Sequence, residues 1–154
     1  MNDLPDLHVM SVKVPVSDLA ASRRWYAEVF GLREEMEWPD SDGVVRGIAF
    51  SGLGEVLLAL REHPVAAAAT RDFGFLNVQV PEEDDLASCS AHLDRLQVRH
   101  TAVISGANGR LVGFHDLDGH ELSFYAKTST GVRDDAIRPV RAAGRHPTPT
   151  ATAT

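Results

Sequence analysis

The chain has 154 residues, 44% of them hydrophobic and 24% charged, with a formal net charge of -7, as expected for one globular domain. No apolar run approaches the roughly 18 residues that cross a membrane, and the first residues lack the basic start of a signal peptide, so we expect a cytoplasmic protein without membrane contact. The acidic balance argues against nucleic acid as a partner, and the single cysteine, Cys89, excludes an intramolecular disulfide.

The first half of the chain predicts a strand, a helix and three further strands. Residues 12–16 alternate apolar side chains, Ser17 and Asp18 supply a helix cap, and the helical pattern of residues 19–30 stops at Gly31. Glycine-containing turns separate the next three strands, which we place at Arg33–Trp38, Val44–Phe50 and Glu55–Leu60.

The same order returns after a predicted loop that contains the four alanines 66–69. A strand at 73–80 is followed by the acidic residues 82–85, which open a helix over 86–96. The three closing strands are predicted at Val98–Ile104, Arg110–His115 and Glu121–Lys127.

This repeat of element types predicts an α+β fold built from two tandem βαβββ modules. We expect a single domain over residues 1–127, with the first module at about 8–61 and the second at about 73–127. Residues 128–154 lose periodicity and end in HPTPTATAT, which predicts a largely disordered C-terminal tail.

Two stretches resemble the vicinal oxygen chelate superfamily of glyoxalases, bleomycin-resistance proteins and extradiol dioxygenases. The first is the strand that runs into Ser17-Asp18-Leu19, followed by Trp25-Tyr26 and Phe30-Gly31-Leu32. The second is FHDLDGHELSFY, residues 114–125, which is similar to the closing hairpin of that family. The resemblance covers residues 8–127 and implies a cupped, mostly antiparallel sheet with helices on its outer face, and a homodimer.

In the metalloenzymes of this family, a histidine from the first strand of a module and a carboxylate from a last strand point into the cup. The corresponding positions here fall on Ser11 and Phe75 for the first strands, and on about Leu58 and Ser123 for the last strands. None of these four side chains is a good ligand for a divalent metal. We therefore expect no metal and no other cofactor.

Other histidines and acids leave an alternative open, namely a shifted metal site. His8 and His120 lie three residues from Ser11 and Ser123, so in regular strands they point to the opposite face. Glu121 shares the face of Ser123 but lies about 7 Å further along. A one-residue bulge would overturn this parity. The remaining candidate ligands for such a site are Glu62 and His115.

Strand parity also gives a predicted lining for the cup, which mixes apolar and aromatic surface with a few hydrogen-bonding groups, as small-molecule sites do. Trp38 is a candidate for stacking on a flat ligand, and Lys13 and Arg46 are candidates for binding an anionic group. The predicted ligand-binding residues are Ser11, Lys13, Trp38, Arg46, Leu58, Phe75, Asn77, His115, Ser123 and Tyr125.

Two functions follow. The first is metal-independent binding of a hydrophobic or aromatic small molecule, similar to sequestration by bleomycin-resistance proteins. The second is a metal-free enzyme, such as a cyclase, isomerase or lyase, in which Tyr125, His115 or Glu121 transfers a proton. A divalent-metal lyase or dioxygenase with shifted ligands is a third possibility. The sequence assigns no catalytic residue and does not name the ligand.

Overall fold

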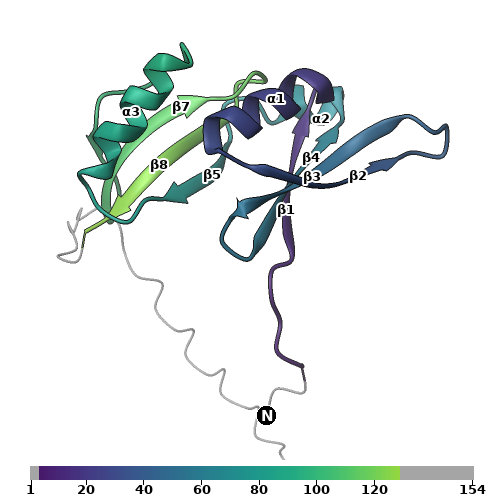
Figure 1. Ribbon diagram of the computed structural model, residues 1–154, viewed down its shortest axis with the longest axis horizontal. Coiled ribbons are helices and arrows are strands. Elements are labelled where there is room, and N and C mark those ends of the chain that lie inside the picture. The colour runs from purple at the N-terminus through teal and green to yellow at the C-terminus, as the bar shows by residue number, and fades with distance from the viewer. Residues whose placement is uncertain (1–3, 129–154) are drawn as a thin grey trace, which may run out of the picture.

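The computed structural model describes residues 4–128, which form two four-stranded sheets and three helices (Figure 1). The elements in chain order are β1 (Ser11–Val16), α1 (Leu19–Phe30), β2 (Arg33–Pro39), β3 (Val45–Leu53), β4 (Val56–Glu62), α2 (Pro64–Ala69), β5 (Gly74–Gln79), α3 (Asp85–Arg95), β6 (Ile104–Ser105), β7 (Gly109–His115) and β8 (Glu121–Lys127).

The two sheets repeat one topology, which confirms the predicted tandem βαβββ fold. The strand orders are β1-β4-β3-β2 and β5-β8-β7-β6. In each sheet the first and last strands of the module pair in parallel, and the remaining neighbours are antiparallel. Helices α1 and α3 lie on one side of the two sheets (Figure 1). We call the opposite side of each sheet its open face.

Helix α1 begins and ends where the sequence predicts. The carboxylate of Asp18 accepts a hydrogen bond from the N–H of Ala21, which satisfies one of the free donors of the first turn. Gly31 ends the helix with a φ of 62°, a left-handed conformation that favours glycine. The buried side of the helix carries Leu19, Ser22, Tyr26 and Val29.

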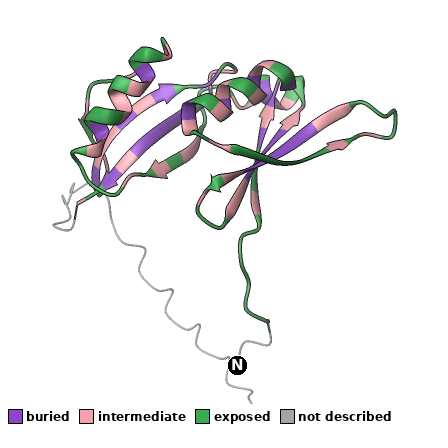
Figure 2. Ribbon diagram, in the orientation of Figure 1, coloured by how far each residue is buried: buried purple, intermediate pink, exposed green. Residues whose placement is uncertain are grey.

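Helix α1 packs against both sheets, so the two modules share one core. Its Phe30 ring lies 5.9 Å from the Phe114 ring and 5.5 Å from the Phe124 ring, both on the second sheet. From the other module, His92 of α3 places Nε2 3.1 Å from the carbonyl oxygens of Glu28 and Val29 at the end of α1. Figure 2 shows buried stretches along the strands beneath this helix layer.

Two local predictions are wrong. The four alanines belong to α2 rather than to a loop, because His63 caps the N–H of Ala66, Pro64 starts the helix and alanine has the highest helix propensity. The predicted strand at 98–104 reduces to β6. Before it, only an isolated bridge between His100 and Phe114 pairs this segment with β7.

Within residues 4–128, no helix is long and apolar enough to span a membrane. The predicted C-terminal tail lies outside the described residues, apart from Thr128.

A buried carboxylate connects the modules. Asp116, in the turn between β7 and β8, accepts a hydrogen bond from the hydroxyl of Tyr26 at 2.6 Å and one from Nδ1 of His120 at 2.8 Å. Its other oxygen accepts the backbone N–H groups of Asp118 and His120. The opposite ring nitrogen of His120 lies 3.0 Å from Oγ1 of Thr70, which follows α2. Asp116 thereby joins α1 to the closing hairpin, and His120 extends the network to Thr70.

Removing this carboxylate by Asp116→Ala should lower the free energy of unfolding by about 3 kcal/mol, because Tyr26 and His120 would remain buried without their acceptor. Urea denaturation followed by far-UV circular dichroism measures the change. Asp6→Asn, on the exposed N-terminal segment, is the control. A loss of less than about 0.5 kcal/mol for Asp116→Ala would show that the network does not stabilise the fold.

Burial, and then the negative charge of Asp116, raise the pKa of Tyr26 far above its ordinary value of 10.0. Because the folded state keeps this proton, the stabilisation is complete below pH 10 and is lost as the pH rises further. In an alkaline titration, the tyrosinate absorbance of wild type and that of Tyr26→Phe should therefore rise together with pH until wild type unfolds. Ionisation of Tyr26 in the folded protein would contradict this assignment.

Candidate functional site

Two hollows border β5, and Asn77 of this strand lines both. The first, about 640 Å³, lies between β1 and β5 next to the end of α1, and Val12, Leu57, Phe75 and Gln79 contribute to its wall. The second is about 1020 Å³. Its lining includes Leu111, Gly113, His115, Glu121 and Ser123.

Asn77 and Ser123 form the polar centre of this region. They lie directly opposite each other on the parallel strands β5 and β8, and the hydroxyl of Ser123 donates to Oδ1 of Asn77 at 2.6 Å. Ser123 is buried, whereas Asn77 is exposed. Because Oδ1 is occupied, the amide NH₂ of Asn77 remains the group best placed to donate to a ligand. The predicted odd-numbered face of β5 and β8 therefore brings two predicted site residues together.

Two titratable side chains face each other on the same sheet. His115 on β7 and Glu121 on β8 are direct cross-strand partners, and both are exposed. Directly opposed residues on antiparallel strands have Cβ atoms about 5 Å apart, close enough for a shared proton or a common ligand. Tyr125 lies further along β8, where its hydroxyl accepts the N–H of Asn108.

Phe75 has an irregular position. The pairing of β5 with β8 shifts between Gly74 and Leu76, so Phe75 is the extra residue of a bulge. Its ring packs edge-on against His120, with centroids 4.6 Å apart, and borders the smaller hollow. The bulge shifts the register by one residue, so Asn77 rather than Leu76 stands opposite Ser123.

Three predicted residues occupy the open face of the first sheet. Register places Lys13 in line with Ala59 and Ala49, and Ser11 opposite Leu57. Trp38 of β2 stands opposite Gly47, and Nζ of Lys13 lies 5.9 Å from the centroid of its ring. Lys13 and Trp38 therefore form a cation–π pair on this face.

Sequence reasoning missed Gly47. A Cβ atom at this position would lie only 2.2 Å from Cε2 of Trp38, so the indole rests directly on the backbone of β3. The available signal was a glycine inside the strand pattern Val-Val-Arg-Gly-Ile-Ala-Phe, because such a glycine often marks a close approach.

The placement of Arg46 in the cup is wrong. It shares the helix-facing side with Ile48, and its guanidinium pairs with Asp42 at 2.8 Å and Asp40 at 3.3 Å. Leu58 also faces the helices, opposite Val12 and Phe50, although it reaches the wall of the smaller hollow. The error arose because even positions on β1 pair with even positions on β4, so Leu58 shares the buried side of Val14 and Val16.

The positions on the first and last strands of the open faces carry no strong ligand for a divalent metal, apart from Glu121. Ser11, Asn77 and Ser123 carry neutral oxygen and nitrogen groups, and Leu57 and Ala59 are aliphatic. Across residues 4–128, no three His, Cys, Asp or Glu side chains cluster in a way that would hold an ion. His115 and Glu121 are two facing groups without a third.

The remaining candidate ligands lie elsewhere. His120 is fully buried against Asp116, and His8 is exposed in the segment before β1. Glu62 accepts the N–H of Leu19 at the start of α1, on the helix side. These side chains do not converge on His115 and Glu121.

The comparison with protein families agrees with this architecture. The family described as Glyoxalase/Bleomycin resistance protein/Dioxygenase superfamily matches residues 7–124. The chain belongs to this superfamily. No curated protein matches it.

Solved structures of this superfamily share the fold at low sequence identity. A glyoxylase/bleomycin resistance protein/dioxygenase domain from Frankia sp. EAN1pec superposes with a TM-score of 0.65 at 22% identity, covering 80% of this chain and 100% of that one. Lactoylglutathione lyase from Agrobacterium tumefaciens superposes with a TM-score of 0.63 at 18% sequence identity, and the match covers 80% of this chain and 96% of that one. A third structure is a mutant of the fosfomycin resistance protein FosX from Listeria monocytogenes, complexed with Mn(II) and 1S,2S-dihydroxypropylphosphonic acid. It superposes with a TM-score of 0.65 at 16% sequence identity, and the match covers 79% of this chain and 94% of that one.

The assignment of faces on β4 predicts unequal costs for two adjacent leucines. Leu58→Ala should lower the free energy of unfolding by about 3 kcal/mol, because it would empty a fully packed position under the helices. Leu57→Ala, on the half-buried open side, should cost about 1 kcal/mol or less. Thermal and urea unfolding of both variants provide the measurement. Equal costs would contradict the register.

Proposed function

We propose that this chain binds a hydrophobic or aromatic small molecule at its open face without a metal ion, in the manner of a sequestration protein. The observation that carries the proposal is the Asn77–Ser123 pair between two hollows: a hydroxyl and an amide, bonded to each other, in a largely apolar surround. Such neutral groups orient a ligand by hydrogen bonds but supply no charge for a divalent cation.

The size and lining of the smaller hollow support this proposal. Its volume of about 640 Å³ is within the usual range for small-molecule sites. The wall is mainly aliphatic, with the Phe75 ring on one side and the amides of Asn77 and Gln79 as polar groups. A hydrophobic ligand would exchange water for this wall and gain specificity from the two amides.

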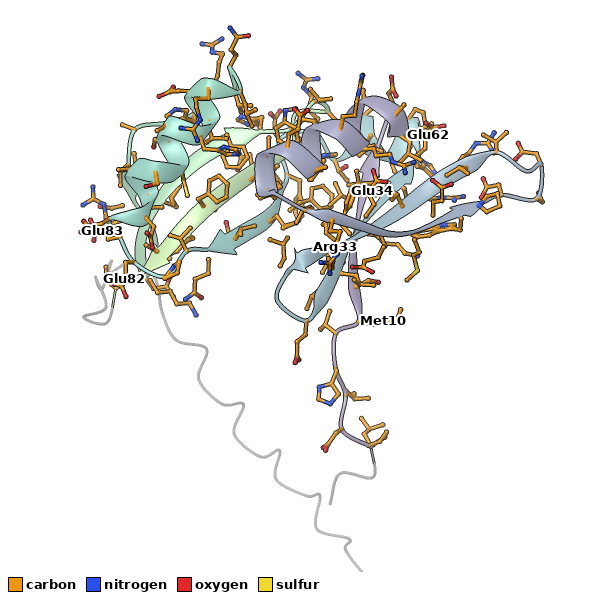
Figure 3. The ribbon with its side chains drawn as sticks, in the orientation of Figure 1. Met10, Arg33, Glu34, Glu62, Glu82 and Glu83 are labelled. Carbon is orange, nitrogen blue, oxygen red and sulfur yellow. The ribbon has the colours of Figure 1, made fainter. Side chains whose placement is uncertain are left out.

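We also propose a homodimer. Four apolar residues before and at the foot of β1 are exposed, namely Leu4, Leu7, Val9 and Met10. In Figure 3, the side chain of Met10 lies at the base of β1, away from the helices. Among the described residues, β1 and β5 each have one unpaired edge. An apolar extended segment and open edges favour pairing with a second copy.

The second candidate function is metal-free enzymatic catalysis. It rests on the opposed side chains of His115 and Glu121 at the larger hollow, which together resemble an acid–base pair. Proton transfer by this pair would support an isomerase, cyclase or lyase. The fold relatives named above include a lyase, although their identity to this chain is below 25%.

Protein purified without added metal should contain far less than one Fe, Mn, Ni or Zn per chain by elemental mass spectrometry. In equilibrium dialysis with EDTA, at least one member of a panel of aromatic and glycopeptide-like compounds should bind and be recovered unchanged. Ser123→Ala should weaken that binding by roughly three- to tenfold, because it frees Asn77 to turn away. One tightly held metal per chain, or no binding by any member, would refute the proposal.

Mass analysis of the recovered compound separates the two functions. A transformed product that disappears in the variants His115→Ala and Glu121→Gln, while binding remains, would identify the chain as an enzyme. An unchanged compound bound equally by both variants would favour sequestration.

A further inference from the structure

The open face of the first sheet contains a flat aromatic platform. The Trp38 indole lies against Gly47, where the absence of a side chain lets one face of the ring contact the strand. Neighbouring positions on this face, Ala49 and Ala59, have small side chains. Nζ of Lys13 lies over the Trp38 ring. A planar partner would therefore take the place of this ammonium, and offset stacking on an indole is a favourable arrangement for such a partner.

The charge beside this platform is positive. Nζ of Lys13 stands 5.9 Å from the centre of the Trp38 ring, and no carboxylate within residues 4–128 forms an ion pair with it. The long aliphatic stem of lysine lets this ammonium move from the ring to a ligand at small cost. The distance is short enough for one planar molecule to touch both groups.

The carboxylates on the same sheet are already neutralised. One carboxylate oxygen of Asp40 forms an ion pair with Arg61 at 2.7 Å, and the other forms an ion pair with Arg46 at 3.3 Å. Glu35 accepts hydrogen bonds from Ser51 and Arg33, which in that order lower its pKa. The face thus keeps a cation in excess on a protein whose formal net charge is -7.

We propose that the Lys13–Trp38 pair, which lies outside the lining of both hollows, binds a planar aromatic compound bearing a carboxylate or another anionic group attached to its ring system. The ring stacks on Trp38 and the anion meets the ammonium of Lys13. This inference rests on the proposed binding function and adds a charge requirement to it, with Gly47 as the residue that fixes the height of the platform.

The test compares a matched pair of probes, 2-naphthoate and its neutral amide 2-naphthamide, by isothermal titration calorimetry in EDTA. Wild type should prefer 2-naphthoate by about tenfold, and added salt should reduce this preference. Lys13→Met should remove the preference and leave 2-naphthamide binding within about twofold. Lys127→Met, the other lysine of the chain, should behave as wild type.

Two variants report on the platform itself. Trp38→Leu should weaken both probes, and Gly47→Ala should do the same because its Cβ would displace the indole. Circular dichroism confirms that each variant is folded.

The outcomes separate this inference from the broader proposal. Equal binding of the two probes by wild type, or equal effects of Lys13→Met and Lys127→Met, would overturn the charge requirement while small-molecule binding stands. Binding that is unchanged in both Trp38→Leu and Gly47→Ala would overturn the platform. If neither these probes nor any other aromatic compound binds, the proposed function itself fails.

Discussion

The architecture depends on one buried carboxylate. Asp116 accepts four hydrogen bonds, from the Tyr26 hydroxyl, the His120 ring and two backbone N–H groups. A carboxylate out of contact with water is costly unless every lone pair finds a donor, and here the donors come from both modules. The closing hairpin is thus fixed against α1, and nearby the side chain of Asp118 accepts the N–H of Ser17. The hydrogen bonds that Asp116 requires, together with the aromatic contacts of Phe30, therefore fix the position of one module against the other.

This arrangement separates stability from binding. The core lies between the helices and the even-numbered side of each sheet, so the open faces have little part in holding the modules together. In this chain the polar pair Asn77–Ser123 and the cationic pair Lys13–Trp38 occupy these faces, and His115 with Glu121 supplies the nearest titratable groups. Membership of a superfamily that includes metalloenzymes therefore does not by itself assign metal chemistry to this chain.

Much of the fold followed from the sequence because local signals agreed with global ones. The Asp18 cap, the Gly31 stop and the alternation of β1 each had a direct physical cause, and the doubled element order gave the topology. The sequence did not predict which positions of β3 and β4 face the helices. Alternation within one strand does not show which side a neighbouring strand's residues take until the register between the strands is known. The predicted placements of Arg46 and Leu58 were wrong for this reason.

His120 illustrates the same limit from the other direction. Parity excluded it from the open face, and the structure places it in the core. Its role there depends on Asp116, whose carboxylate also binds Tyr26, 90 residues earlier in the chain. No local pattern in the sequence reports a contact over that separation.

The central claim is that ligands are held at the open face without metal, and the two tryptophans of the chain test it directly. Trp38 lies on the open face of the first sheet, whereas Trp25 packs beside Tyr26 and Phe114 and borders the larger hollow. In a ¹H–¹⁵N spectrum recorded in EDTA, titration with 2-naphthoate should shift the indole N–H signal of Trp38 more than that of Trp25. A Trp38 signal that stays in place, or shifts that appear only after Zn²⁺ is added, would contradict the account.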